Sequence, residues 1–304
     1  MSSYKKIKSV CDEIGCEYNE NTLLSNCTSF KIGGKADLFV QPDSVEKLTA
    51  VISGCKKNGI EILILGKGSN LLFSDEGFRG VVISTSRLDK IELIDETTIY
   101  CQSGVTLSKL CRFALDNSLT GLEFAYGIPG SVGGAVYMNA GAYGGEISDV
   151  VVSSEYYDTH NDILVTIDSA AHNFSHRHSI FHDHTEYIIL STTLKLKVGD
   201  SEEIFNLMTK NMSSRREKQP LEYPNAGSTF KRPEGYFAGK LIEDSGLKGY
   251  TIGGAQVSEK HAGFLINRGG ATSSDVLSLM EHIKHTVKGN YGVDLESEII
   301  YIPY

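Results

Sequence analysis

The segment AYGIPGSVGGAVYMNAGAYGGE, residues 125–146, is the part of the chain that decides how the rest is interpreted. It contains seven glycines, at positions 127, 130, 133, 134, 141, 144 and 145. Glycine has no Cβ, so its backbone reaches positive φ and its N–H group can come very close to a ligand. Such a segment serves a tight turn, a close crossing of two backbones or a bound anion. The surrounding sequence has to separate these three uses.

Composition limits the class of protein. The chain has 304 residues, a hydrophobic share of 40% and a formal charge of −9. This length suits two or three packed units, and no apolar run approaches the ~18 residues of a membrane helix. The first residues lack the apolar core of a signal peptide, and the six cysteines include no CxxC pair. We therefore expect a reduced, cytoplasmic protein that binds no membrane, and the acidic charge argues against nucleic-acid binding.

Hydrophobic periodicity predicts an α+β protein. Helical spacing of apolar residues occurs over 44–59, 106–115, 204–219, 236–247 and 273–292. Ser44 and Thr106 are the expected N-caps of the first two helices. Short runs rich in β-branched and aromatic residues predict strands over 60–66, 80–85, 99–105, 149–159, 162–168, 187–197, 261–269 and 294–302. The composition changes near Gly199, where we expect a domain boundary.

The segment GKGSNLL, residues 66–72, follows a predicted strand, where a dinucleotide-binding fingerprint would lie. It lacks the third glycine of GxGxxG, and the chain contains no GxxxxGK[ST] phosphate loop. By itself the segment is more simply a tight turn. Together with residues 125–146, it could instead surround a diphosphate with backbone N–H groups.

The histidine-rich segment NFSHRHSIFHDH, residues 173–184, raises the question of a metal site. Its spacing matches no standard zinc pattern, and the fixed positive charge of Arg177 would oppose a cation. We predict no bound metal. The simpler interpretation is a solvated polar stretch before the strand at Tyr187, although this does not account for Arg177 and Ser179.

Two further candidates lie near the C-terminus. Ser228 stands in YPNAGSTFKRP, residues 223–233, which is not the GxSxG of a hydrolase, and a loop serine bonded to nearby backbone is the simple alternative. Glu296 and Glu298 share one face of the predicted final strand, because side chains at i and i+2 point to the same side. A solvated strand face is the simple alternative for them.

Seven motifs in this order resemble the UDP-N-acetylenolpyruvoylglucosamine reductase family, from about Asn26 to Ile302. They are TSFKIGGKAD, GKGSNLL, GIPGSVGGAVYMNAGAYGGE, HRHSIF, NAGSTFKRP, GLKGYTIGGAQVSEKHAGFLIN and GVDLESE. The resemblance implies an FAD-binding domain of the vanillyl-alcohol-oxidase type and a C-terminal α/β substrate-binding domain. The compact spacing is similar to the shorter subtype, which lacks a tyrosine-bearing loop.

The resemblance also implies a reaction. FAD would pass a hydride from NADPH to the enolpyruvyl double bond of UDP-N-acetyl-3-O-(1-carboxyvinyl)-glucosamine, giving UDP-N-acetylmuramate for peptidoglycan. The matching catalytic positions are Arg177, Glu298 and the proton donor Ser228, and the substrate-binding positions are Lys231, Lys248 and His261. The matching FAD-binding positions are Gly66, Lys67, Gly68, Ser69, Asn70, Leu71, Tyr126, Gly127, Pro129, Gly130, Ser131, Gly133, Gly134, Asn139, Gly141 and Ala142. No histidine lies in GKGSNLL, so we expect FAD to bind non-covalently.

The resemblance assigns residues 1–199 to the FAD-binding domain, with two subdomains divided near residue 85. It assigns 200–295 to substrate binding and 296–304 to a final strand carrying the active-site glutamate, and we expect a monomer. The chain departs from the family pattern at His176, usually tyrosine, at Ser297, usually proline, and at Ile300, commonly arginine. A flavin oxidase and a non-catalytic nucleotide-sugar-binding protein are the alternatives. The first would dispense with Ser228, and the second would have no use for Arg177, Ser228 and Glu298 together.

Overall fold

The computed structural model describes residues 3–304, which divide into two compact units. Within the described residues, the first unit contains the chain up to Glu20, then Leu38–Lys67 and Gly80–Ser214. The second unit contains Asn21–Asp37, Gly68–Arg79 and Arg215–Tyr304. Both units are discontinuous in the sequence, so a single boundary near Gly199 does not separate them. The predicted assignment of residues 1–199 to FAD binding and of 200–295 to substrate binding concerns ligands rather than packing, and it stays a prediction.

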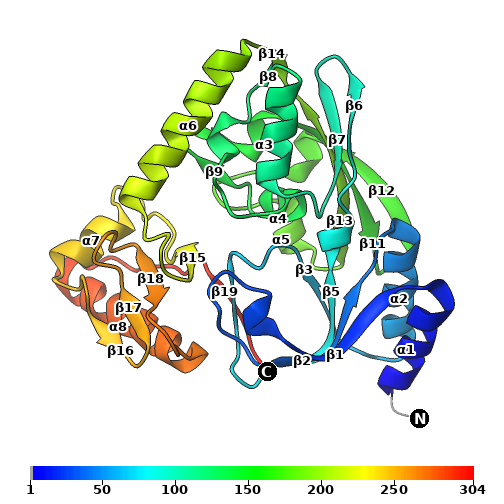
Figure 1. The fold of residues 1–304 in the computed structure, drawn as a ribbon. Coiled ribbons are helices and arrows are strands. Elements are labelled where there is room, and N and C mark those ends of the chain that lie inside the picture. Colours follow the sequence, from blue (N-terminus) through cyan, green and yellow to red (C-terminus); the bar gives the residue numbers. More distant parts are fainter. Residues whose placement is uncertain (1–2) are drawn as a thin grey trace. The chain divides into compact units, whose positions relative to one another are not determined.

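The structure contains α-helices, strands and short 3₁₀ turns throughout its length (Figure 1). The helices are α1 (Ser3–Ile14), α2 (Val45–Lys57), α3 (Leu107–Asp116), α4 (Val132–Tyr137), α5 (Ile180–Asp183), α6 (Ser201–Lys218), α7 (Ala238–Asp244) and α8 (Ser273–Tyr291). The strands are β1 (Glu17–Leu23), β2 (Lys35–Gln41), β3 (Ile62–Leu65), β4 (Leu71–Phe73), β5 (Phe78–Ser84), β6 (Ile91–Asp95), β7 (Thr98–Gln102), β8 (Leu119–Thr120), β9 (Gly141–Ala142), β10 (Gly145–Glu146), β11 (Val151–Asp158), β12 (Ile163–Asp168), β13 (Tyr187–Lys195), β14 (Lys197–Val198), β15 (Asn225–Ser228), β16 (Thr251–Ile252), β17 (Ala255–Val257), β18 (Phe264–Asn267) and β19 (Ile300–Ile302).

The first layer of the first unit combines helices α1 and α2 with β3 and the larger parts of β1, β2 and β5, in a four-stranded sheet of order β1-β2-β5-β3. Helix α2 begins as predicted, because the Ser44 hydroxyl accepts a hydrogen bond of 3.2 Å from the Lys47 N–H. Its apolar face is buried at Leu48, Val51, Ile52 and Cys55. These side chains join a core with residues of α1, β2 and β5.

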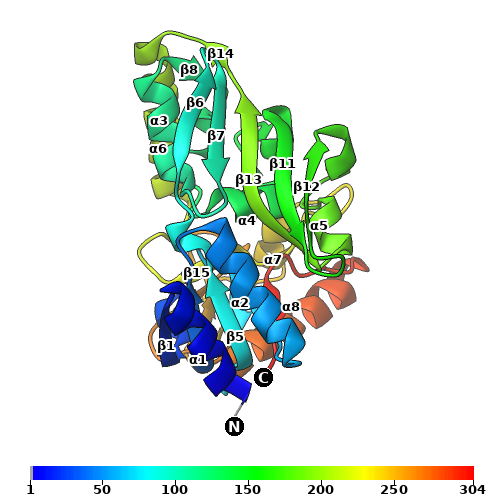
Figure 2. The ribbon, with the colours of Figure 1, turned by 90° about the vertical axis from the view of Figure 1, so that its right-hand side faces the viewer.

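A five-stranded sheet of order β12-β11-β13-β7-β6 forms the second layer of the same unit (Figure 2). Helix α4 packs against β13 and β7. Helix α3 has the predicted cap, since the Thr106 hydroxyl accepts from the Lys109 N–H at 3.2 Å. The apolar sides of α3 and α4 share one core with this sheet. The Gly-rich segment, defined as residues 125–146, is hydrogen-bonded through Val132 and Gly133 to the residues that follow β7.

The second unit contains a sheet of order β15-β18-β17-β16, helices α7 and α8, and the parallel pair β4–β19. Helix α8 begins with a capping box in which Thr272 and Asp275 bond each other's backbone N–H groups. The spacing predicts one apolar face with Val276, Leu277, Met280, Ile283 and Val287; all of these are buried except Leu277, which is partly buried against the same core. The core of this unit is separate from the two cores of the first.

The final strand is shorter than predicted, and its first half pairs elsewhere. Only Ile300–Ile302 forms β19, which pairs with β4. Ser297 instead forms an antiparallel bridge with Phe230, and the Glu298 N–H donates to the Thr229 carbonyl at 2.9 Å. The chain changes partner between these pairings, so the prediction of one strand over 294–302 is wrong. Alternating side chains in the sequence cannot reveal such a change of partner.

Two general properties bear on what the chain can bind. No helix within residues 3–304 has both the length and the apolar character needed to cross a bilayer. All six cysteines are free thiols.

Candidate functional site

The Gly-rich segment lies in the first unit, where the backbone after β7 holds it in place. The Val132 N–H donates to the Val105 carbonyl at 2.8 Å, and the Gly133 N–H donates to the Ser103 carbonyl at 2.9 Å. A Cβ added to Gly133 would lie 2.8 Å from the Ser103 Cβ, closer than real Cβ contacts allow. Gly133 therefore serves a close backbone crossing, and its N–H is used within the protein.

Neighbouring glycines have different surroundings. Gly134 is exposed, and a Cβ there would meet only the Ser131 hydroxyl, at 3.6 Å. A Cβ on Gly66 would lie 2.5 Å from that same hydroxyl. The Gly-rich segment thus approaches Gly66 closely at Ser131, whereas its Gly134 is exposed.

Two buried hydroxyl groups at this place have no hydrogen-bond partner among the described residues. They belong to Ser103 and Ser131, whose exposed fractions are 1% and 3%. A buried hydroxyl without a partner costs about 1–3 kcal/mol, so native structures rarely leave one unused. A bound polar ligand would supply the missing partner. The two hydroxyls and the open backbone at Gly134 therefore fit the polar part of a cofactor such as FAD.

Arg177 stands at the tip of a tight turn beside the Gly-rich segment. Ser175 and His178 exchange backbone hydrogen bonds of 3.1 and 3.2 Å, so His176 and Arg177 are the central residues of a two-residue turn. Arg177 has φ +58°, a conformation that costs a non-glycine residue on the order of 1–3 kcal/mol. Its guanidinium donates to the Gly141 carbonyl at 3.1 Å. The structure thus brings predicted catalytic and cofactor-binding positions together.

The histidine-rich segment is only partly the solvated stretch predicted from its composition. Ser179 and Phe181 are buried, and residues 180–183 form α5. His178 pairs with Asp183 at 3.2 Å, and the His182 ring stacks on Tyr137 with centroids 3.9 Å apart. Across residues 3–304, no three His, Cys, Asp or Glu side chains are grouped so that they could hold a metal ion.

Ser228 and Glu298 lie on paired backbone segments in the second unit. Ser228 is the exposed last residue of β15, and the next residue, Thr229, accepts the Glu298 N–H. The Asn70 side-chain amide donates to the Glu298 carbonyl at 2.9 Å. The Ser297 hydroxyl donates to the Ile299 carbonyl at 2.7 Å, a local bond that fixes the backbone where the family pattern has proline. Ser228, Glu298 and Asn70 are thus held around one short bridge.

The predicted substrate-binding side chains lie in the same unit. Lys231 Nζ is 3.4 Å from a Glu296 carboxylate oxygen, and Lys248 Nζ is 2.8 Å from Glu243. Burial, and secondarily the charge of Lys248, lower the pKa of His261. The His261 Nδ1 accepts a 3.1 Å hydrogen bond from the Gly263 N–H, which leaves the proton of the neutral ring on Nε2. His261 can therefore donate from Nε2 to a ligand oxygen.

The other predicted cofactor-binding residues have varied environments. Lys67, Pro129 and Gly134 are exposed, whereas Gly68 is buried and has φ +62°. A Cβ on Gly68 would lie 2.3 Å from the Cys27 carbonyl oxygen. The positions Gly66, Ser69, Leu71, Tyr126, Gly127, Gly130, Gly141 and Ala142 are partly exposed. Asn139 is fully buried, and its amide is used inside the protein.

Ser103 is the site residue that the sequence analysis missed. It lies directly after β7, its carbonyl accepts the Gly133 N–H of the Gly-rich segment, and its hydroxyl is buried with no partner among the described residues. The only signal was the pair Ser103–Gly104 at the end of a predicted strand. Such a pair is common in turns, so it did not distinguish a ligand-facing position.

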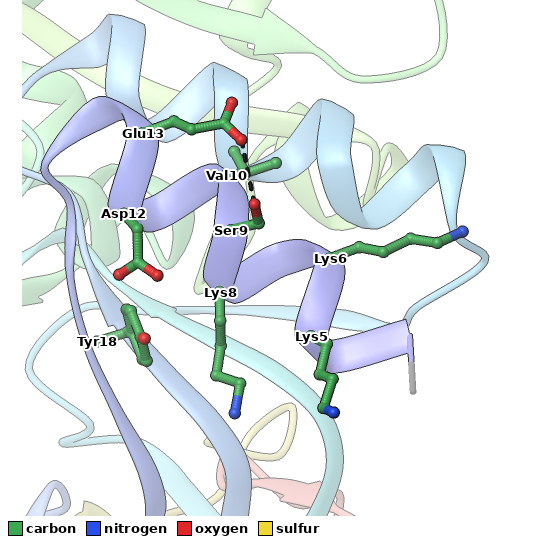
Figure 3. A pocket seen from close by; sticks show the side chains of 8 residues that line it. All are labelled: Lys5, Lys6, Lys8, Ser9, Val10, Asp12, Glu13 and Tyr18. Atoms are coloured by element: carbon green, nitrogen blue, oxygen red, sulfur yellow. Dashed lines mark hydrogen bonds between the residues drawn. The ribbon is translucent and has the colours of Figure 1, made fainter. Parts of the chain in front are cut away.

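One cavity of about 500 Å³ lies outside these regions, along α1 (Figure 3). Lys5, Lys6, Lys8 and Tyr18 are among its lining residues, and the Ser9 hydroxyl bonds Glu13 on its wall. None of the predicted site residues lines it. Lys8, one of its lining residues, is paired with Glu20 at 2.9 Å.

Two family models match separate parts of the chain. Residues 36–168 match the model of an FAD binding domain, and residues 219–302 match that of the UDP-N-acetylenolpyruvoylglucosamine reductase C-terminal domain. The chain is similar to the reductase of that name from Clostridium novyi, with 51% identity over 97% of this chain and 94% of the relative. The relative from Caldanaerobacter subterraneus is 49% identical, over 97% of this chain and 96% of its own length.

A solved structure supports the same similarity. The crystal structure of UDP-N-acetylenolpyruvylglucosamine reductase from Thermus caldophilus matches with a TM-score of 0.80 at 32% identity. The match covers 95% of this chain and 99% of that one. The α+β fold with an FAD-binding domain and a C-terminal domain, expected from the sequence, is therefore confirmed.

Proposed function

The chain belongs to the UDP-N-acetylenolpyruvoylglucosamine reductase family, and from this we propose how its own residues carry out the reaction. The enzyme is an FAD-dependent oxidoreductase that uses NADPH. It reduces UDP-N-acetyl-3-O-(1-carboxyvinyl)-glucosamine to UDP-N-acetylmuramate, a step of peptidoglycan precursor synthesis. The function expected from the sequence is confirmed at this level.

Arg177 carries the proposal for the catalytic residues. When bound, FAD supplies the hydride that adds to the terminal carbon of the enolpyruvyl group. This addition moves negative charge toward the substrate carboxylate, where a fixed cation lowers the barrier. Arg177 has the required charge, and the strained turn aims it from beside the Gly-rich segment. Glu298 is the second proposed catalytic residue, by its match to the family motif.

Ser228 is the proposed proton donor. After hydride addition, the carbon that bears the carboxylate needs a proton, and the hydroxyl of Ser228 would supply it. Ser228 is exposed at the end of β15, where a substrate can reach it. A serine is a weak acid, so its alkoxide needs stabilising neighbours to act as a proton donor.

The proposed ligand contacts divide between the two units. FAD is proposed to bind non-covalently along the Gly-rich segment and GKGSNLL, supported by the unpaired hydroxyls of Ser103 and Ser131. Lys231, Lys248 and the Nε2–H of His261 are proposed to bind the UDP part of the substrate. We further propose the shorter subtype without the tyrosine loop, a monomeric state, a cytoplasmic location, and the ligand-based division at residues 199 and 295.

Replacing Ser228 tests the proton-transfer step. In Ser228→Ala, FAD binding and flavin reduction by NADPH should be unchanged, because neither needs this proton. Reoxidation of the flavin by the enolpyruvyl substrate should slow by about 10²–10⁴, the usual value of a positioned general acid. Stopped-flow absorbance of the flavin measures the two half-reactions separately.

Two further variants complete this test. Ser228→Cys should recover part of the loss, since a thiol also donates a proton. Ser245→Ala, which removes a hydroxyl at the end of α7 in the same unit, should match the parent in both half-reactions. If Ser228→Ala reoxidises at the parent rate, Ser228 has no chemical role in the reaction.

A further inference from the structure

Asn139 closes helix α4 in a left-handed conformation. Its φ is +41°, its N–H donates to the Val136 carbonyl at 3.2 Å, and the Ala140 N–H donates to the Ala135 carbonyl at 2.8 Å. This pair of bonds is a Schellman motif, in which the left-handed residue is usually glycine and sometimes asparagine. Glycine would suit the backbone here, so the side chain of Asn139 needs its own explanation.

The side-chain amide of Asn139 joins three separate segments. Asn139 is 0% exposed, and its Nδ2 donates to the Ser175 carbonyl at 3.0 Å. Its Oδ1 accepts from the Ser148 N–H, also at 3.0 Å. The amide thus ties the end of α4 to the turn that follows β10 and to the start of the Arg177 turn.

The bond to Ser175 falls on the base of that turn. The Ser175 carbonyl also accepts the His178 N–H that closes the turn, so Asn139 and the turn share one acceptor. Arg177 at the tip has positive φ, which an arginine adopts only where surrounding contacts enforce it. Its guanidinium is bonded to Gly141, two residues after Asn139. Asn139 and Gly141 therefore hold the base and the tip of the same turn.

We propose that Asn139 is a positioning residue for Arg177, holding the turn 175–178 in the conformation that directs the guanidinium at the substrate. This inference rests on the proposed role of Arg177. It also changes the role expected from the sequence, where Asn139 was a cofactor-binding position. Both polar atoms of its amide are bonded within the protein, so its side chain serves the turn and not the flavin.

Two variants separate the amide from the backbone. Asn139→Gly keeps the left-handed conformation and removes both amide bonds. Asn139→Asp keeps an oxygen for the Ser148 N–H but replaces the donor that faces the Ser175 carbonyl. Asn211→Ala is the matched control, because Asn211 is also buried, at 7% exposure, and donates to a backbone carbonyl, that of Glu123, at 3.0 Å.

The expected result is a selective loss. Asn139→Gly and Asn139→Asp should bind FAD with the parent's affinity and be reduced by NADPH at the parent rate. Reoxidation by the enolpyruvyl substrate should slow by about 10²-fold, the effect of misplacing a catalytic group by about 1 Å. Hydrogen–deuterium exchange of the His178 amide, measured without substrate, should accelerate in both variants. Asn211→Ala should change neither the exchange of that amide nor either half-reaction.

A double-mutant cycle distinguishes positioning from a general loss of stability. In the Arg177→Ala background, Asn139→Gly should cause no further slowing of reoxidation, because residues that act as one unit are not additive. Equal slowing in both backgrounds would overturn the proposal, as would weaker FAD binding in Asn139→Gly. If Arg177→Ala alone reoxidises normally, the proposed role of Arg177 has failed instead. If Arg177→Ala is slow and Asn139→Gly is normal, only the positioning inference has failed.

Discussion

At the scale of single residues, His172 is a buried titratable group outside the proposed chemistry. Its Nδ1 is 2.7 Å from the Asp168 carbonyl, which can only accept, so Nδ1 carries the proton. Its Nε2 then accepts from the Ser154 hydroxyl at 2.8 Å. Burial lowers the pKa of His172 below its ordinary value of 6.5. The folded protein therefore prefers the neutral ring.

This preference predicts a pH dependence of stability. The lowered pKa means that the unfolded chain binds a proton first, so the stabilisation is fully present above pH 6.5. It is lost as the pH falls from 6.5 toward the folded-state pKa, by up to about 1.4 kcal/mol per pH unit. His172→Phe fills the space without titrating, so its stability should fall less steeply over this range.

Urea unfolding between pH 7.5 and 5 measures this difference. Parallel pH curves for the parent and His172→Phe would show that folding does not lower the pKa of His172, and would contradict this prediction.

At the scale of elements, helix α4 contains two adjacent glycines with opposite roles. An added Cβ at position 133 meets the Ser103 Cβ at 2.8 Å, whereas at position 134 it meets only an ordinary contact of 3.6 Å. Gly133→Ala should destabilise the protein by about 1–3 kcal/mol through overpacking. Gly134→Ala should leave stability equal or higher by about 0.5–1 kcal/mol, as expected for alanine in a helix.

FAD binding gives a second measurement that distinguishes Gly133→Ala from Gly134→Ala. Because Gly134 is the exposed position, Gly134→Ala should weaken FAD binding although the apoprotein is stable. Thermal unfolding of the apoprotein and fluorescence titration with FAD measure the two effects independently. A Gly133→Ala protein as stable as the parent would contradict the close crossing, and unchanged FAD affinity in Gly134→Ala would remove Gly134 from the site.

The sequence predicted helices and strands well wherever the residues of a single segment determine its structure. Ser44 and Thr106 cap helices α2 and α3 because each side-chain hydroxyl accepts a hydrogen bond from the backbone N–H three residues later. The final strand was predicted too long because Glu298 and Ile300 pair with different segments. The positive φ of Arg177 could not be predicted from its neighbours in the sequence. The contacts that hold this turn come from Asn139 and Gly141, about 36 residues earlier in the chain.

At the scale of the whole molecule, the two units are assembled from interleaved parts of the chain. The second unit takes Asn21–Asp37 and Gly68–Arg79 from within the first half of the sequence. Composition changes along the chain only once, near Gly199, so a boundary drawn from it cannot recover this arrangement. Function was nevertheless accessible from the sequence, because the motifs carry the chemistry whichever unit contains them.

The chain reduces the enolpyruvyl substrate with electrons from NADPH through bound FAD. The most direct test is the visible absorption of the flavin in purified protein without oxygen. We predict that NADPH bleaches the flavin band and that the enolpyruvyl sugar nucleotide then restores it, with UDP-N-acetylmuramate formed in equal amount. A protein that binds no flavin, or a bleached flavin that the substrate fails to reoxidise while oxygen succeeds, would contradict this reaction.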